Sequence, residues 1–274
     1  MRNSGPRRLA LPMYDLPELE WATGALAASL LAGLSNAGLG GLPQAREQPD
    51  DLPALWRDPS LLLAQTCGYP LATTLRGQVR LVATPCYTAP GCDGPQMCSA
   101  IVVRADDPAR DLAGLRGRAV CALNGHDSNS GMNLLRAAVA PLAGGERFFR
   151  DIVVTGSHAA SLGAVQAGQA DIAAIDCVTL ELLRRVRPAA LAGLRVLDWT
   201  PSSPGLPLVM ARGRDAADRA ALRAALDGLL LDPALAGARD ALLIERFAFL
   251  DEEEYAIIAE MEREAGALGY PVLR

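Results

Sequence analysis

The sequence contains no lysine, few aromatic residues and only two histidines. All 26 basic residues are arginine, aromatic residues make up 4% of the chain, and the formal net charge is -5. No basic run is longer than the pairs Arg7-Arg8 and Arg184-Arg185. Because a nucleic-acid-binding surface needs clustered positive charge, the composition argues against that class of protein.

The cysteine pattern does not predict a metal centre. The six cysteines form no CxxC pair, and two histidines are too few for a recognisable zinc cluster, so we predict neither a metal nor a cofactor. Cys121 and Cys177 stand in apolar, strand-like contexts, where a free cysteine behaves as a small buried hydrophobe. Cys67 and Cys92 each stand next to a glycine in a predicted loop. Whether they form a disulfide in an oxidising compartment stays open.

The N-terminal segment is arginine-rich, with Arg2 among its basic residues, yet it lacks the apolar core of a signal peptide. The run from Leu9 to Tyr14 is interrupted by Pro12 and is too short. The run from Ala22 to Leu34 follows acidic residues and falls short of the ~20 residues that span a bilayer, so we interpret it as a buried helix. We therefore predict no membrane insertion, and either a cytoplasmic protein or a numbering that omits a leader.

With 274 residues, the chain is long enough for one large domain or two modest ones. Half of its residues are hydrophobic, so it can bury a large core. Short apolar runs alternate with helical segments, which predicts an α/β protein with a mainly parallel sheet covered by helices. The predicted strands are 8–12, 61–65, 79–83, 98–104, 119–123, 152–154, 172–175, 194–197 and 206–211. The predicted helices are 17–35, 133–139, 159–167, 178–187, 214–230 and 251–264.

A polar stretch, residues 124–132, separates a predicted buried strand from a predicted helix. The first turn of a helix has backbone N–H groups without partners and the positive end of the helix dipole, so small polar residues there form a neutral anion site. Ser128, Asn129 and Ser130 are the candidate donors. The alternative is that Asp127 or Ser128 only caps the helix, since both are favoured cap residues.

Two further polar residues follow predicted strands. His158 comes after the loop 155–157 and begins a predicted helix, either as a functional residue or as a core or capping histidine. Asp176 ends the buried run 170–175, where a carboxylate needs a partner because an unpaired buried charge is costly. Its structural alternative is to cap the helix that follows.

Three of the five tyrosines follow strand candidates: Tyr14, Tyr69 and Tyr87. Ligands bind at the carboxyl ends of strands in parallel sheets, so we expect these tyrosines along one edge. The alternative is that each ring packs with its hydroxyl in water. We find no convincing acid/base pair, activated nucleophile or metal cluster, and therefore predict a protein that is not an enzyme.

Together these motifs resemble the PhnD-like family of phosphate-, phosphite- and phosphonate-binding proteins of ABC importers. The resemblance runs from about Leu9 to Met210 and depends on the order and spacing of five motifs. They are Met13-Tyr14-Asp15, Gln65-Thr66-Cys67-Gly68-Tyr69-Pro70, Ser128-Asn129-Ser130-Gly131, Gly156-Ser157-His158 and Ala174-Ile175-Asp176. It implies a type II periplasmic-binding-protein fold, in which two α/β lobes joined by two crossovers hold the ligand in a cleft. The lobes would be 1–99 with 204–274, and 100–203.

The resemblance also implies roles for single residues. Ser128, Asn129, Ser130 and His158 would donate to a phosphorus oxyanion, and Tyr14, Tyr69 and Tyr87 would close over it. Asn129 stands where family members often have threonine. Asp176 would hold an amine of an aminophosphonate, or accept a proton from a singly protonated oxyanion. The implied partners are a small anionic ligand and an ABC transporter permease, for a monomeric periplasmic protein.

Three other functions remain open at this point. Some relatives sense an oxyanion such as arsenite for a signalling partner, and Cys67, Cys86, Cys92 and Cys98 make arsenite a ligand to test. The same fold carries an enzyme that makes the pyrimidine of thiamine. A cytoplasmic binding module that meets no transporter is the third.

Overall fold

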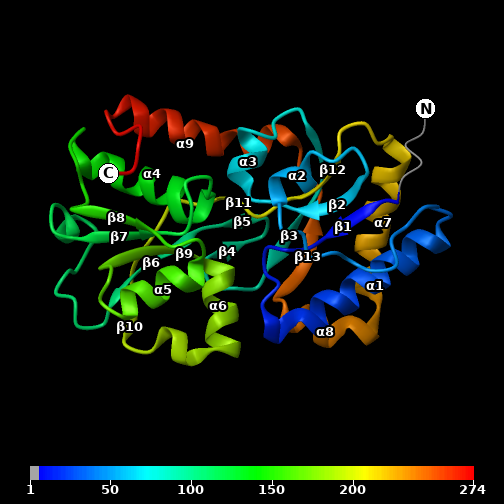
Figure 1. The fold of residues 1–274 in the computed structure, drawn as a ribbon, viewed down its shortest axis with the longest axis horizontal. Helices are drawn as coiled ribbons and strands as arrows, with labels where there is room; N and C mark the ends of the chain where they lie inside the picture. Colours follow the sequence, from blue (N-terminus) through cyan, green and yellow to red (C-terminus); the bar gives the residue numbers. More distant parts are fainter. Residues whose placement is uncertain (1–5) are drawn as a thin grey trace. The chain divides into compact units, whose positions relative to one another are not determined.

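The computed structural model describes residues 6–274, so Arg2 lies outside the described residues. The chain forms two compact units, each built from two segments (Figure 1). The first unit comprises the chain up to Thr88 together with Pro204–Glu254, and the second comprises Ala89–Ser203 together with Tyr255–Arg274. Each unit has its own five-stranded sheet.

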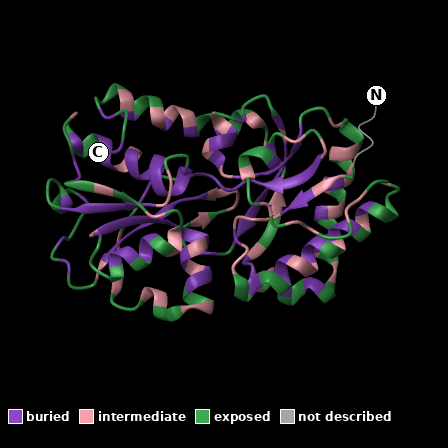
Figure 2. Ribbon diagram, in the orientation of Figure 1, coloured by how far each residue is buried: buried purple, intermediate pink, exposed green. Residues whose placement is uncertain are grey.

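The first unit is a mixed sheet flanked by helices. Its strands are β1 (Arg8–Ala10), β2 (Leu61–Gln65), β3 (Val79–Tyr87), β12 (Leu208–Ala211) and β13 (Ile244–Ala248), in the order β1-β2-β12-β3-β13. Its helices are α1 (Glu20–Asn36), α2 (Leu52–Trp56), α3 (Gly68–Ala72), α7 (Ala216–Leu231) and α8 (Ala236–Ala241), with short 3-10 turns at Pro17–Leu19 and Pro233–Leu235. All five residues of β2 are buried, as Figure 2 shows for most of the sheet. The apolar side chains Leu26, Leu30 and Leu34 recur every fourth residue of α1, so they share one buried face.

The second unit has the same layered plan. Its strands are β6 (Ser99–Arg104), β7 (Val120–Leu123), β8 (Asp151–Val154), β9 (Ile172–Asp176) and β10 (Leu194–Trp199), in the order β10-β6-β9-β7-β8. A π-helical turn (Asn129–Asn133) continues into α4 (Leu134–Ala143), followed by α5 (His158–Gln166), α6 (Cys177–Val186) and α9 (Ala256–Ala267), with 3-10 turns at Ala113–Leu115 and Pro188–Leu191. The hairpin of β4 (Cys92–Asp93) and β5 (Gln96–Met97) precedes β6. Two short elements span the boundaries between the units: β11 (Ser203–Pro204) and a 3-10 turn at Glu252–Tyr255.

Most of the predicted strands and helices are present within a few residues of their expected bounds. The prediction of mainly parallel sheets was wrong, because both sheets are mixed. In the first unit β12 runs antiparallel to both of its neighbours, and in the second β6 does the same. The short elements β4, β5, β11, β13, α3 and α8 were not predicted.

The C-terminal segment belongs to a different unit from the one we expected. We placed 204–274 with the first lobe and began the second lobe at residue 100, but Tyr255–Arg274 and Ala89–Ser99 are part of the second unit. Two buried polar side chains of the second unit hold this segment. Asn133 Nδ2 donates to the Ile258 carbonyl at 3.0 Å, and Arg136 Nη1 donates to the Pro271 carbonyl at 2.8 Å.

Among the described residues, every helix is too short or too polar to cross a membrane. We predicted that the run Ala22–Leu34 is a buried helix. It lies in α1, where Leu26, Leu30 and Leu34 are at most 4% exposed. Cys121 and Cys177 are also buried, as predicted. Neither Cys67 nor Cys92 takes part in a disulfide in this structure, so the pairing that we considered between them is not present.

Candidate functional site

Three helices of the second unit begin at the same edge of its sheet. β8, β7 and β9 are adjacent and parallel, so their carboxyl ends share one edge. The π-turn with α4 follows β7, α5 follows β8 and α6 follows β9. Each helix start presents unpaired N–H groups and the positive end of its dipole. This edge is therefore suited to an anion, and it contains all the polar residues that we predicted in this unit.

Ser128 caps the first of these helices. Its backbone is extended, with φ -82° and ψ 129°, and its Oγ accepts a hydrogen bond of 2.9 Å from the Gly131 N–H. The capping alternative is thus correct for Ser128, but capping uses only the acceptor capacity of its hydroxyl group. Because the oxygen acts as acceptor, the hydroxyl hydrogen can still be donated to another group. Ser128 is 7% exposed.

Ser130 and His158 form a direct pair. Ser130 Oγ lies 2.9 Å from His158 Nε2, and Asn124 Nδ2 lies 3.4 Å from the same nitrogen. The Ser130 carbonyl accepts a 2.9 Å hydrogen bond from Ser99 Oγ, and Ser99 pairs with Asp176 across β6 and β9. The serine is therefore held from both sides, by the histidine through its side chain and by Ser99 through its backbone.

The imidazole of His158 is neutral at pH 7. It is placed as the first residue of α5 by the cap residue Ser157, whose Oγ accepts from the Ala160 N–H at 3.1 Å. Burial lowers the pKa of His158 to about 4. A hydrogen bond with the backbone of Ala174 favours the charged imidazole and offsets only part of this lowering. A neutral imidazole leaves Nε2 free to act as a donor or as an acceptor towards Ser130.

Gly131 is needed for the close approach of the loop to Asn124 and His158. A Cβ built on Gly131 would overlap Asn124 Oδ1, lie 2.7 Å from Asn124 Cγ and lie 3.3 Å from His158 Cε1. No side chain fits there without displacing Asn124. The backbone of Gly131 is therefore part of what fixes the positions of Ser128 and Ser130.

The side chain of Asn129 is used within the protein. Its Nδ2 donates to Ser203 Oγ at 2.8 Å, and its Oδ1 accepts from Asn133 Nδ2 at 3.1 Å. Arg136 Nη2 in turn donates to Asn133 Oδ1 at 2.6 Å, and all four residues are at most 4% exposed. This buried chain of hydrogen bonds orients the Asn129 amide, so its role in positioning the loop is better supported than the donor role that we predicted.

Asp176 caps α6, as the structural alternative predicted. Its Oδ1 accepts a 2.8 Å hydrogen bond from the Thr179 N–H, and the residue is 2% exposed. Its register partner Ser99 donates to the Ser130 carbonyl. Asp176 thus stands at the same sheet edge as Ser130 and His158, and brings a negative charge to it.

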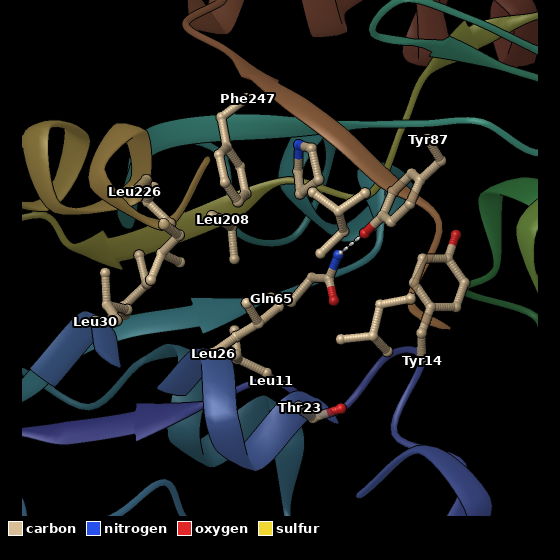
Figure 3. A pocket seen from close by; sticks show the side chains of 15 residues that line it. Leu11, Tyr14, Thr23, Leu26, Leu30, Gln65, Tyr87, Leu208, Leu226 and Phe247 are labelled. Carbon is tan, nitrogen blue, oxygen red and sulfur yellow. Dashed lines mark hydrogen bonds between the residues drawn. The ribbon is translucent and has the colours of Figure 1, made fainter. Parts of the chain in front are cut away.

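The predicted tyrosines lie in the first unit. The rings of Tyr14 and Tyr87 pack edge to face with centroids 5.2 Å apart, and each residue is 7% exposed. Tyr87 OH accepts from Gln65 Nε2 at 3.1 Å, beside an apolar cavity of about 60 Å³ that all three side chains line (Figure 3). Tyr69 lies in α3 and is half-buried. The structure therefore brings Tyr14 and Tyr87 together, with most of their ring surface packed.

The sequence matches one protein family over most of its length. Residues 47–255 match the family described as the periplasmic substrate-binding protein of phosphonate ABC transporters. The chain belongs to this family. No protein of curated function matches it.

Solved structures with the same fold include phosphonate-binding proteins. PhnD1 from Prochlorococcus marinus, solved with methylphosphonate, is 16% identical with a TM-score of 0.75, covering 96% of this chain and 99% of that one. The binding component of an ABC phosphonate transporter from Pseudomonas aeruginosa is 16% identical with a TM-score of 0.76, over 96% and 88%. A protein from Xanthomonas citri, solved with ATP, is 17% identical with a TM-score of 0.71, over 96% and 98%. These structures establish the type II periplasmic-binding-protein fold for this phosphonate-binding family member.

Three residues that support the edge had no role assigned to them from the sequence: Ser99, Asn124 and Gly131, although the last two lie in the polar stretch 124–132. Asn124 directly follows β7 and begins the polar stretch, so its position was a usable signal. Ser99 begins β6 and shows no polar pattern around it. Its importance arises only from the antiparallel register of β6 with β9.

Proposed function

We propose that this chain binds a small phosphorus oxyanion, a phosphonate, phosphite or phosphate, at the helix-start edge of its second unit. The observation that supports this best is the meeting of Ser128, Ser130 and His158 where three helices begin. Hydroxyl hydrogens and helix dipoles stabilise an anion without adding a cation. Each hydrogen bond to a charged oxygen contributes about 1.5–3 kcal/mol.

In this proposal His158 acts through Ser130. When Nε2–H donates to Ser130 Oγ, the Ser130 hydroxyl hydrogen points elsewhere and can be given to the ligand. Ser128 is arranged in the same way, because its Oγ already accepts from the Gly131 N–H. The two hydroxyls are then the ligand donors, and His158, Gly131 and Asn129 position them. Tyr14, Tyr69 and Tyr87 stay predicted ligand contacts.

The charge of Asp176 bears on which substituent the phosphorus of the ligand carries. A buried carboxylate beside a doubly charged oxyanion is unfavourable, whereas beside an ammonium group or a P–OH group it is favourable. We therefore propose that the ligand brings a proton or an amine to Asp176, as 2-aminoethylphosphonate does. We further propose that the protein is a periplasmic monomer that catalyses no reaction. It would deliver the bound ligand to an ABC permease.

A ligand screen by thermal shift tests the proposal. The panel is phosphate, phosphite, methylphosphonate, 2-aminoethylphosphonate, sulfate and arsenite. A ligand at 100 times its Kd adds about 2.7 kcal/mol to the free energy of unfolding, or roughly 5–10 °C in Tm for a chain of this size. We expect such a shift from at least one phosphorus compound and none from sulfate. A response to arsenite alone that disappears in Cys92→Ser would favour the sensor alternative instead.

A further inference from the structure

Three cysteines of the second unit lie together, although the chain brings them from distant positions. Cys92 Sγ is 3.5 Å from Cys177 Sγ, across 85 residues of sequence. Cys98 Sγ is in hydrogen-bond contact with Cys177 and donates to the Gly91 carbonyl at 3.3 Å. All three are free thiols.

The backbone at Gly91 packs closely against this cluster. Gly91 has φ +99°, and a Cβ there would lie 2.9 Å from Cys98 Sγ and 3.0 Å from Cys177 Cβ. Its carbonyl accepts the Cys98 N–H at 3.1 Å, and Cys92 pairs with Met97 across the β4–β5 hairpin. Cys92 is thus held beside the first residue of α6 by a turn that only glycine permits.

We propose that Cys92 and Cys177 form a disulfide by exchange with a small-molecule disulfide such as oxidised glutathione. The Cys92 thiolate attacks one sulfur of glutathione disulfide, which breaks its S–S bond and releases one glutathione. The Cys177 thiolate then attacks Cys92 Sγ and displaces the second glutathione. Two thiols are oxidised, one disulfide is reduced to two thiols, and the two protons pass to the departing glutathiones. The sulfurs must approach by about 1.5 Å to reach the S–S bond length.

Exposure decides which thiol reacts first. Cys92 is half-buried, whereas Cys98 is 6% and Cys177 is 1% exposed. The hydrogen bond with Cys92, followed by burial, raises the pKa of Cys177 above its ordinary value. Cys92 is therefore the thiol that attacks glutathione disulfide first, and Cys177, which is less exposed and has a raised pKa, attacks second.

The bond would tie the hairpin to the start of α6, directly after Asp176. It closes a long loop in the unfolded chain, so it stabilises the folded protein chiefly by restricting the unfolded one. We expect the Tm to rise by roughly 5–10 °C on oxidation. Formation of this disulfide requires no oxyanion ligand, so its test is independent of the proposed function.

Peptide mapping of the full chain tests the proposal. The protein is incubated with oxidised glutathione, blocked with N-ethylmaleimide and cleaved after arginine, which links residues 81–104 to residues 151–184 if a disulfide forms. Cyanogen bromide then cleaves after Met97 and separates Cys92 from Cys98. We expect the cross-link on the Cys92 side, its retention in Cys98→Ser and Cys86→Ser, and its loss together with the Tm rise in Cys92→Ser. A cross-link on the Cys98 side, or glutathione that remains on Cys92, would overturn the proposal.

Discussion

Ser130 Oγ lies 2.9 Å from His158 Nε2, which joins the start of the helix after β7 to the start of the helix after β8. The two residues belong to different helical segments, the π-turn and α5. Their contact depends on the parallel pairing of β7 with β8, in which Leu123 is the partner of Val154. The contact makes the hydroxyl of Ser130 the best-positioned donor of the proposed oxyanion site, and most of the following predictions depend on it.

Ser130→Ala is expected to weaken phosphonate binding about 10- to 100-fold, because one hydrogen bond of about 1.5–3 kcal/mol to a charged oxygen is lost. Isothermal titration calorimetry measures the change. Ser35→Ala, at an exposed position of α1, is the matched control and should bind like the wild type. Equal affinities for both variants would remove Ser130 from the site.

Gly131→Ala is expected to lower both affinity and stability, because the new methyl group must displace Asn124. Gly163→Ala makes the same chemical change in the middle of α5, where the added Cβ has no atom within 4 Å apart from its chain neighbours and the nearby backbone of the helix. That control should be as stable as the wild type or more stable by about 0.5–1 kcal/mol. Urea unfolding and calorimetry on both proteins check the pair, and similar behaviour of the two variants would contradict the close approach.

His158 should make stability depend on pH in the acidic range. Its pKa is about 4 in the folded protein and 6.5 in the unfolded chain. The unfolded state therefore binds more protons between these values, and stability falls as pH drops from about 6.5 towards 4, by an amount on the order of 1–3 kcal/mol. In a His126→Gln background His158 is the sole histidine, so its NMR titration reports the pKa directly. The added change His158→Gln should remove this part of the pH dependence, and a titration midpoint near 6.5 would refute the assignment.

Asp176→Asn keeps a favourable helix cap but removes the charge. We expect the variant to remain folded and to lose preference for 2-aminoethylphosphonate over methylphosphonate, since the ammonium group loses its counterion. Competition calorimetry with the two ligands measures the ratio of affinities. An unchanged ratio would mean that Asp176 acts as a cap alone.

Much of this architecture is predictable from the sequence, and the reasons differ between elements. The strand 61–65 was predicted at its observed bounds because four apolar residues followed by Gln65 stand between polar turns. The π-turn after β7 was expected as a helix start because serine and asparagine favour that position. β13, in contrast, is half exposed and carries Glu245 and Arg246, so its composition resembles a helix or a loop.

The side-chain roles were harder to predict because they depend on packing between distant residues. The sequence suggests Asn129 as a donor, but its amide is bound by Ser203 and Asn133, which are 74 and 4 residues away. The C-terminal helix α9 packs with the π-turn and α4, where Asn133 binds the Ile258 carbonyl and Arg136 binds the Glu262 carboxylate. No local pattern in 256–267 indicates that partner. The same limit applies to Cys92 and Cys177, whose proximity requires the complete fold of the second unit.

The most direct test is calorimetric titration of methylphosphonate and 2-aminoethylphosphonate into the wild type and into the double variant Ser128→Ala/Ser130→Ala. Because both substitutions remove hydroxyl donors at one helix start, we predict measurable binding of at least one ligand by the wild type and a loss of at least 100-fold in a variant that still unfolds cooperatively. Undiminished affinity in the folded double variant would contradict the claim that this edge of the second unit holds the oxyanion.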